Sequence, residues 1–457
     1  MNGSPSQVDL IREAFHYQSR FEGSTMVFKI DFPVTESPGF PYLMKDLALL
    51  AQTGFRIVIV PGAKESIDEA FKQHEIDSAY GIWGEMEEPA RITTAEAIPF
   101  VERAAFHVAT RFMTFLSGSR VDAVIGNFVR ARGLGVLGGI DMEHTGTVDK
   151  IYTDSISRVL KLGMVPILPC IGWNPSGKPY NVPSDEIALA VSAALGAIKL
   201  FIVSAHGRIC RKAFPLPEHI ETREDGSVVR LTPQETEAVI ASLAGEKAGE
   251  GEDLPQALRA LRLGLRASRA GVDRVHIVDG SKEGAILKEL FSNLGAGTMI
   301  FADEYESIRP FHSRDLPDIL RLMEPLMQAG ILIRRTAEQI QEKKGDYAVF
   351  EIDGSVHACG ALHDWGEGQG EIAAVASAPL YAGTNLGRRI VGYLIEKARK
   401  SGMGRVFVLT TQTQDWFESL GFREASVDSL PQRKRQLYNH TRKSKVFALE
   451  LGAKEQG

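Results

Sequence analysis

The chain has 457 residues, of which 44% are hydrophobic and 24% are charged, and its formal net charge is −6. These values are typical of globular domains, and the length exceeds what one ordinary core can organise, so we expect two or three domains. The mild negative charge gives no electrostatic support for a general nucleic-acid or anionic-membrane partner.

The three cysteines are dispersed and form no Cys–His cluster, which argues against a disulfide scaffold and against a metal site. No run approaches about 18 consecutive apolar residues, and the first residues lack an apolar segment of signal-peptide length. We therefore expect a cytoplasmic protein that uses no metal and does not enter a membrane.

The first half of the chain alternates short β-rich runs with helical runs. Such alternation indicates crossover units around a mainly parallel sheet that helices cover on both faces. Strands are expected at 26–28, 56–60, 121–131, 165–172 and 197–205, and helices at 8–20, 42–53, 154–163 and 186–196. A helix, a strand and a further helix follow between residues 254 and 297.

The loop after the first strand is unusual for a phosphate-handling domain. Lys29 ends that strand, as in many such domains, but the glycines that would let backbone N–H groups close on phosphate are absent. The chain has Ile30, Asp31 and Phe32 instead, and Gly62 alone is kept after the second strand. Because these side chains would crowd a phosphate and Asp31 would repel it, we expect this domain to lack phosphotransfer.

The pattern changes near residue 305, where a smaller unit of strands and helices begins. We expect one domain at 1–304 and a second at 305–457. Residues 371–400 of the second domain predict a strand, a loop and a helix that begins with adjacent arginines.

The loop and helix start in this segment predict an anion site. Backbone N–H groups at a helix N-terminus attract anions, and cationic side chains add to the attraction. The same residues could also form an ordinary strand-to-helix turn. The candidate binding residues are Gly383, Asn385, Leu386, Gly387 and Arg388.

The order of these elements, this loop and the later "DWFESLGF" at 415–422 resemble the GCN5-related N-acetyltransferase (GNAT) fold. In that family the loop binds the pyrophosphate of acetyl-CoA, the acetyl donor. The match to the family's loop pattern is incomplete, because Ala382 and Asn385 stand at its first two fixed positions and only Gly387 at the third. Many members have a proton-donating tyrosine where this chain has Phe417, so another donor must serve.

Four segments make the resemblance more specific: 331–340, 370–379, 406–422 and 427–446 look like the matching parts of the bacterial N-acetylglutamate synthase family. The first domain resembles the amino-acid kinase fold, so the resemblance covers nearly the whole chain. It implies an α/β protein in which an amino-acid kinase-like, mainly parallel sheet sandwich precedes a smaller α+β acetyltransferase domain. The implied reaction transfers acetyl from acetyl-CoA to the α-amino group of L-glutamate, in arginine biosynthesis.

Acetyl transfer to an amine requires a base for the ammonium, a donor that polarises the thioester carbonyl and a proton for the leaving thiolate. The resemblance gives the first role to Glu371 and the second to the backbone N–H groups of Val375 and Ala376. Thr410 is the candidate thiolate donor, with Thr411 as the alternative. On position alone, Glu371 could form a surface ion pair and Thr410 could be an ordinary strand residue.

The resemblance also implies the residues that bind the two carboxylates of glutamate. They are Arg334, Arg442 and Ser444. Arginine grips a carboxylate through two N–H groups at once, which lysine does not do. Without the resemblance, Arg334 could equally well be a solvated charge at a helix end.

The first domain resembles that of the arginine-sensitive members, in which an N-terminal helix interlaces dimers into a hexamer and covers an arginine pocket. We therefore expect a homo-oligomer, between dimer and hexamer, that binds L-arginine as an effector. Lys282 stands where relatives usually have Glu, and the segment could instead be only a capped helix. The candidate arginine-binding residues are Tyr17, Glu283, Gly284, Gly295 and Gly297.

Three other functions stay open on the sequence alone. One is a bifunctional synthase and kinase, which the missing glycines oppose. Another is a catalytically silent arginine sensor that binds partner proteins. The third is an acetyltransferase that acts on a different amine, although carboxylate-binding arginines disfavour polyamines.

Overall fold

A computed structural model describes residues 15, 18–19, 21–81, 90–205, 207–211, 214, 216–220, 222–244, 253–291, 295–301, 306–352, 355–378 and 386–451. The chain divides into two compact units, Gln7–Asp303 and Glu304–Gly457. Most of the helix expected at 8–20, and Tyr17 with it, lies outside the described residues.

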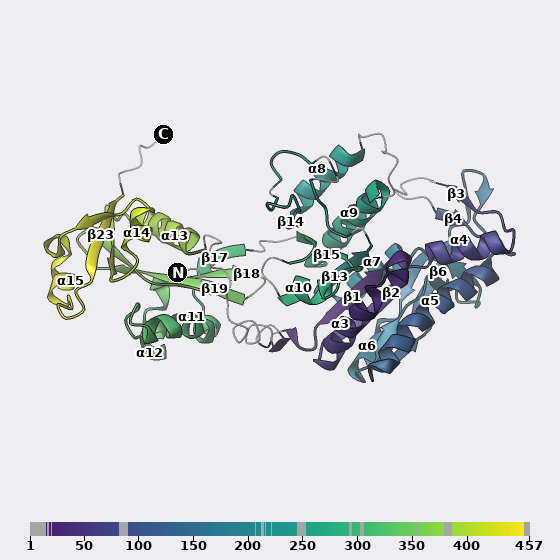
Figure 1. The fold of residues 1–457 in the computed structure, drawn as a ribbon, viewed down its shortest axis with the longest axis horizontal. Helices are drawn as coiled ribbons and strands as arrows, with labels where there is room; N and C mark the ends of the chain where they lie inside the picture. The colour runs from purple at the N-terminus through teal and green to yellow at the C-terminus, as the bar shows by residue number, and fades with distance from the viewer. Residues whose placement is uncertain are drawn as a thin grey trace. The chain divides into compact units, whose positions relative to one another are not determined.

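The unit Gln7–Asp303 is built on an eight-stranded sheet in the order β14-β16-β15-β13-β1-β2-β10-β5, in which only the β15–β16 pair is antiparallel (Figure 1). A four-stranded sheet, β12-β11-β6-β9, accompanies it. The strands of the first sheet are β1 Thr25–Ile30, β2 Arg56–Pro61, β5 Ala123–Ile125, β10 Val165–Ile167, β13 Lys199–Ser204, β14 Arg230–Leu231, β15 Arg274–Asp279 and β16 Thr298–Phe301. Those of the second are β6 Val129–Gly133, β9 Gly146–Ile151, β11 Ile171–Trp173 and β12 Pro179–Asn181, and the short pairs are β3 Ala79–Gly81 with β4 Ala90–Ile92 and β7 Val136–Leu137 with β8 Ile140–Asp141.

Helices cover the large sheet on both faces, and its central strands direct apolar side chains toward both of these faces. In β1, Met26 and Phe28 belong to one hydrophobic core and Val27 to the other, as the alternation of side chains along a strand requires. The helices of the first core are α2 Phe32–Glu36, α3 Phe40–Gln52, α4 Lys64–Gln73, α5 Ile98–Gly118 and α10 Ala285–Phe291. Those of the second are α6 Thr153–Lys161, α7 Ser184–Leu195, α8 Pro233–Ala244 and α9 Asp253–Arg269. The expected parallel α/β architecture is confirmed.

Two strands expected from the sequence are each two strands in the structure. The run 121–131 divides into β5 and β6, and the run 165–172 into β10 and β11, with the halves in different sheets. At Gly126 a Cβ atom would come within 2.7 Å of the Phe128 ring, and Pro169 has no N–H for a ladder. Both residues therefore mark places where the chain leaves one sheet for the other.

The unit Glu304–Gly457 has a seven-stranded sheet in the order β17-β18-β19-β20-β21-β23-β22. Helices α13 and α11 lie on opposite faces of this sheet (Figure 1), each over its own apolar core. The strands are β17 Glu306–Pro310, β18 Tyr347–Ile352, β19 Ser355–Asp364, β20 Gln369–Ser377, β21 Arg405–Thr410, β22 Arg423–Ala425 and β23 Lys445–Glu450. The helices are α11 Leu316–Gln328, α12 Ala337–Glu342, α13 Leu386–Lys400, α14 Gln414–Glu418 and α15 Gln432–Gln436.

Candidate active site

The central strands β20 and β21 separate part of the way along their length. They pair in parallel only at Gln369–Arg405, Gly370–Val406 and Glu371–Phe407. Beyond that point β21 continues its pairing with β23 alone, as far as Thr410 with Lys445. The edge of β20 after Glu371 therefore has no ladder partner on the β21 side, and its backbone groups there can serve a ligand.

A β-bulge lies in the separated part of β20. Ala358 and Cys359 pair with Ser377 and Ala376, but the register shifts before Ala361 pairs with Ala373. Ala374 and Val375 therefore oppose Gly360 alone, and Ala374 has φ +53°, which is rare for a residue with a side chain. Strained backbone of this kind concentrates at ligand sites. Val375 lies in the bulge, whereas Ala376 is back in register.

Glu371 is buried at the point where the two strands part, with 5% of its surface exposed. The Lys434 ammonium lies 2.7 Å from its Oε1 and 2.6 Å from its Oε2, and the Trp365 indole N–H donates to Oε2 at 2.8 Å. The candidate base is thus an ion-paired carboxylate inside the molecule, not the surface pair that its position alone allowed. Directly across on β19 stands His363, which is held by Asp346 at 2.6 Å.

The candidate anion site is described only in part. Gly383 and Asn385 lie outside the described residues. Leu386 is buried at the start of α13, and a Cβ atom at Gly387 would approach the Trp416 ring to 3.1 Å, so a small residue is needed there. Arg388 reaches the Ser419 carbonyl only at 3.5 Å, which leaves its guanidinium available for an anion. The N-terminus of α13 follows the separated end of β20 in the chain.

The hydroxyl of Thr410 is engaged with the turn that leads into α14. It shares a hydrogen bond of 2.8 Å with the Thr413 hydroxyl and accepts one of 3.0 Å from the Thr413 amide. Thr411 is exposed. Phe417 is buried and packs edge-on against Trp416 and Phe422, so the position where relatives place a proton donor belongs here to the core.

Two of the three candidate carboxylate binders lie on segments that touch. The Arg442 guanidinium donates to the carbonyls of Gly330 and Ile331 at 3.0 and 2.5 Å, just before Arg334 in the chain. Arg334 is exposed. Ser444 is buried, and its carbonyl accepts a hydrogen bond of 2.7 Å from Tyr438. These three roles remain predictions.

The sequence assigns no role to Lys434 or Trp365. Lys434 lies in the segment 427–446 that resembles the synthase family, but the resemblance gives it no partner. Trp365 lies in the turn between β19 and β20, 69 positions from Lys434 in the numbering of the chain. No pattern along the sequence links residues so far apart.

In the other unit, the candidate arginine-binding segment forms a loop fixed by a buried carboxylate. Glu289 accepts hydrogen bonds from His276 and from the amides of Ala296 and Gly297, all at 2.6–2.7 Å. Burial alone would raise the pKa of Glu289, but these hydrogen bonds outweigh it and hold that pKa below its usual value. Gly295 has φ +56°, and a Cβ atom at Gly297 would clash with the Ile277 carbonyl.

Glu283 and Gly284 lie at the start of α10, close to a buried carboxylate of α3. Burial is the main cause that raises the pKa of Asp46 to about 6; a backbone hydrogen bond from Leu287 lowers this pKa, and the charge of Glu283 adds to the rise. Gly284 has φ +67°, as a residue without a side chain readily adopts. Glu283 thus has carboxylates and the lysines Lys282 and Lys288 near it in this segment.

The end of β1, where a phosphate-handling domain would bind its ligand, holds a closed set of four charges. Lys29 is 1% exposed and pairs with Asp31 and, at 2.7 Å, with Asp185. Arg259 contacts the same two carboxylates at 2.7 and 2.8 Å. The Gly62 amide donates to the Ile30 carbonyl at 2.7 Å. The cations and this amide are thus occupied within the protein.

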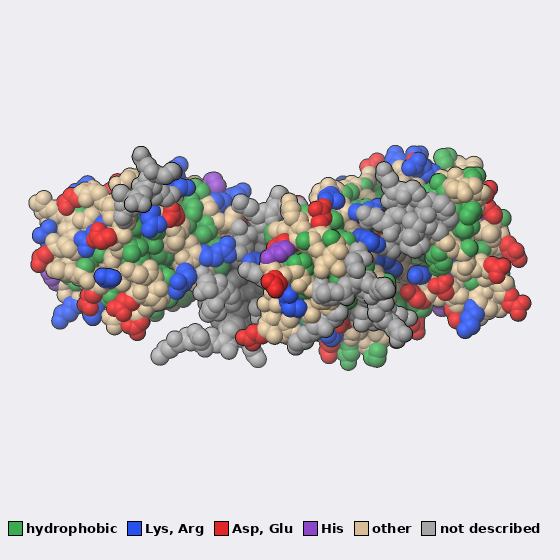
Figure 2. All heavy atoms as spheres, turned by 90° about the horizontal axis from the view of Figure 1, so that it is seen from above, with side chains coloured by type: hydrophobic (Ala, Val, Ile, Leu, Met, Phe, Trp, Pro, Cys, Tyr) green, Lys and Arg blue, Asp and Glu red, His purple; other side chains and the backbone are tan. Residues whose placement is uncertain are grey.

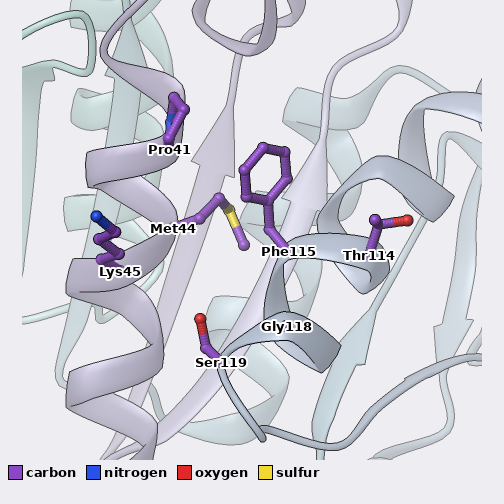
Figure 3. Close-up of a pocket in the computed structure, with 7 residues that line it drawn as sticks. All are labelled: Pro41, Met44, Lys45, Thr114, Phe115, Gly118 and Ser119. Atoms are coloured by element: carbon purple, nitrogen blue, oxygen red, sulfur yellow. The ribbon is translucent and has the colours of Figure 1, made fainter.

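A shallow apolar pocket of about 220 Å³ lies between α3 and α5 (Figure 3). Met44 and Phe115 point toward each other in it, and Lys45 and Thr114 lie at its edge. Because Lys45 is the one ionisable side chain of its lining, this pocket offers no acid–base pair for catalysis.

Cationic and anionic side chains are interspersed over the described part of the face that Figure 2 shows. Within the described ranges, no helix is both long and apolar enough to span a bilayer. The described residues likewise contain no group of three or more His, Cys, Asp or Glu side chains placed to hold a metal ion.

Family models match each unit in turn. The Amino acid kinase family matches residues 33–216, and the Acetyltransferase (GNAT) family matches residues 316–422. The fold and the separated strands beside Glu371 accordingly define an acyltransferase with a GNAT domain and an amino-acid kinase-like domain.

Relatives that span the whole chain make the assignment specific. The amino-acid acetyltransferase of Escherichia coli K12 is 33% identical over 97% of this chain and 98% of its own length, and that of Vibrio cholerae is 31% identical over 98% and 99%. The crystal structure of N-acetylglutamate synthase from Neisseria gonorrhoeae with coenzyme A and L-arginine is 31% identical and covers 98% of this chain and all of its own, with a TM-score of 0.78. The chain belongs to the amino-acid acetyltransferases, the N-acetylglutamate synthase family.

Proposed function

We propose that this enzyme transfers the acetyl group of acetyl-CoA to the α-amino group of L-glutamate and forms N-acetyl-L-glutamate. The observation that carries the proposal is the buried carboxylate of Glu371 at the point where β20 and β21 part. The similar synthase from Neisseria gonorrhoeae binds coenzyme A, and a second structure of it holds N-acetyl-glutamate as well.

The separated edge of β20 suits a thioester ligand. The N–H groups of Val375 and Ala376 would donate to the carbonyl oxygen of acetyl-CoA and stabilise the negative charge that develops there. The pyrophosphate would bind at the N-terminus of α13, where Leu386, Gly387 and Arg388 begin the helix and Gly383 and Asn385 precede it. The strained Ala374 supports this arrangement, because bulges redirect backbone groups toward sites.

Each bond change in the transfer has a candidate group. Glu371 takes the proton from the substrate ammonium, directly or through one water, and the neutral amine then forms the new C–N bond. The nitrogen of the adduct still carries one proton too many. As the C–S bond breaks, Thr410 gives its hydroxyl proton to the thiolate and regains a proton from this nitrogen, directly or through water, with Thr411 as the alternative donor; Glu371 then releases its proton to solvent. Arg334, Arg442 and Ser444 bind the carboxylates of glutamate, which selects this acceptor over simple amines.

The other domain, residues 1–304, is assigned a role in regulation and assembly in place of phosphotransfer. The closed charges around Lys29 support the loss of phosphate binding. L-arginine is the proposed effector, with Tyr17, Glu283, Gly284, Gly295 and Gly297 as its ligands. The proposal also places the enzyme in the cytoplasm and assigns it a homo-oligomeric state.

An acceptor screen tests this function. Purified full-length protein is incubated with acetyl-CoA and each amino acid or polyamine, and thiol release is followed with and without L-arginine. We expect release with L-glutamate at least tenfold above other amines and a changed rate when arginine is added. ADP formation from ATP and N-acetyl-glutamate, measured in parallel, is expected to be absent.

Two results would reject the proposal. Coenzyme or arginine binding without thiol release would indicate a silent sensor. ADP formation would indicate a bifunctional synthase and kinase.

A further inference from the structure

Lys434 is the one cation that the described structure places on the carboxylate of Glu371. Its ammonium contacts both carboxylate oxygens, at 2.7 and 2.6 Å, from 63 residues away in the chain. The two side chains are 12% and 7% exposed. A buried carboxylate without a cationic partner costs free energy, so this contact stabilises the proposed base in its buried position.

The position of Lys434 is fixed by the elements around it. Its ammonium lies 4.6 Å from the centre of the Trp365 ring, within the range of a cation–π interaction. The amide of Gln432, in the same helix, donates to Glu367 in the turn that holds Trp365. Arg405 of β21 holds Ser429 just before α15 through contacts of 3.2 and 3.3 Å. Lys434 is thus held at β20 by its contact with Glu371, and its helix is held at β21 by the contact of Arg405 with Ser429.

The contacts on Glu371 leave one direction open for a proton. An ionised carboxylate has about four acceptor positions on its two oxygens. Lys434 and Trp365 both bind Oε2, and Lys434 also binds Oε1. One acceptor position remains, on Oε1.

We propose that Lys434 is a positioning residue of the acetyl transfer, which holds the Glu371 carboxylate through both oxygens and directs its Oε1 toward the substrate ammonium. The proposal rests on the function proposed above. In the step it serves, one N–H bond of the ammonium breaks, the proton goes to Oε1, and Glu371 becomes a neutral acid. Lys434 stays an ammonium throughout and touches no reacting atom.

A double-mutant cycle tests this role. Lys434→Met should lower kcat by about tenfold or more, with the KM for acetyl-CoA nearly unchanged. The loss should not exceed the ~10²- to 10⁴-fold that the general base itself contributes. In a Glu371→Gln background the same change should cost less than about twofold, because Lys434 acts only through the carboxylate. Lys434→Arg, which keeps the cation, should recover part of the loss.

A matched control and a stability measurement complete the experiment. Arg433→Met removes an exposed cation from the same helix and should leave kcat unchanged. Lys434→Met should lower the denaturation midpoint, and adding Glu371→Gln should restore it, since no unpaired carboxylate is left. This arm needs no activity, so it tests the pairing even if L-glutamate proves not to be the acceptor.

Three outcomes would overturn the proposal. Losses that multiply in the Glu371→Gln background would show that Lys434 acts elsewhere. A raised KM for glutamate with unchanged kcat would make Lys434 a substrate ligand. An unchanged kcat in Lys434→Met would show that Lys434 does not position the base, and a lowered midpoint beside it would make the ion pair structural only.

Discussion

Replacing Glu371 by Gln is expected to lower kcat by about 10²- to 10⁴-fold, the range that general-base catalysis contributes. The amide keeps the shape and most of the hydrogen-bonding capacity of the side chain but cannot take a proton from an ammonium ion. The KM for acetyl-CoA should change by less than about twofold, because the contacts that bind the coenzyme equally in the ground state and the transition state are unchanged. Steady-state kinetics with both substrates varied would measure both effects.

Glu418→Gln is the control for that experiment, since Glu418 is exposed on α14. Its kinetics should match those of the unmodified enzyme. A Glu371→Gln enzyme with comparable activity would remove Glu371 as the base and move the search to the neighbouring His363–Asp346 pair.

Replacing Asp185 by Asn is expected to lower the free energy of unfolding by about 2 kcal/mol near neutral pH. Burial would raise the pKa of Asp185, but Lys29 and Arg259 outweigh it and lower that pKa from 3.8 to about 2. Because the folded-state pKa lies below the unfolded value, the stabilisation is complete above about pH 4 and is lost as the pH falls toward about 2.

Denaturant unfolding of both proteins between pH 7 and pH 3 would show this effect as a difference that shrinks with acidity. Asp154→Asn is a close control, because Asp154 is also the second residue of a helix but is exposed. The comparison separates the effect of losing the ion pairs with Lys29 and Arg259 from the effect of losing a negative charge near a helix N-terminus. A difference that stays constant down to pH 3 would contradict the assigned role of the ion pairs.

The residues that could be predicted from sequence are those that lie in continuous motifs. The apolar runs around Phe28 and Phe201 gave the central parallel strands, and the segment from Glu371 to Arg388 gave strand, loop and helix.

The parts that could not be predicted depend on contacts between distant residues. Lys434 reaches Glu371 only because α15 folds against the turn of β19 and β20. The charges around Lys29 come from residues as far apart as Asp31 and Arg259, 228 positions along the chain. The division of 121–131 between two sheets likewise depends on packing, since Gly126 marks a break in the run but does not indicate which sheet each half joins.

A crystal structure of the enzyme with coenzyme A would test the central claim most directly. We expect the pantetheine chain along the unpaired edge of β20, with its sulfur beside Glu371 and its pyrophosphate at the N-terminus of α13. Coenzyme bound elsewhere, with the space between β20 and β21 closed by side chains, would contradict the account, as would a nucleotide triphosphate held at Lys29.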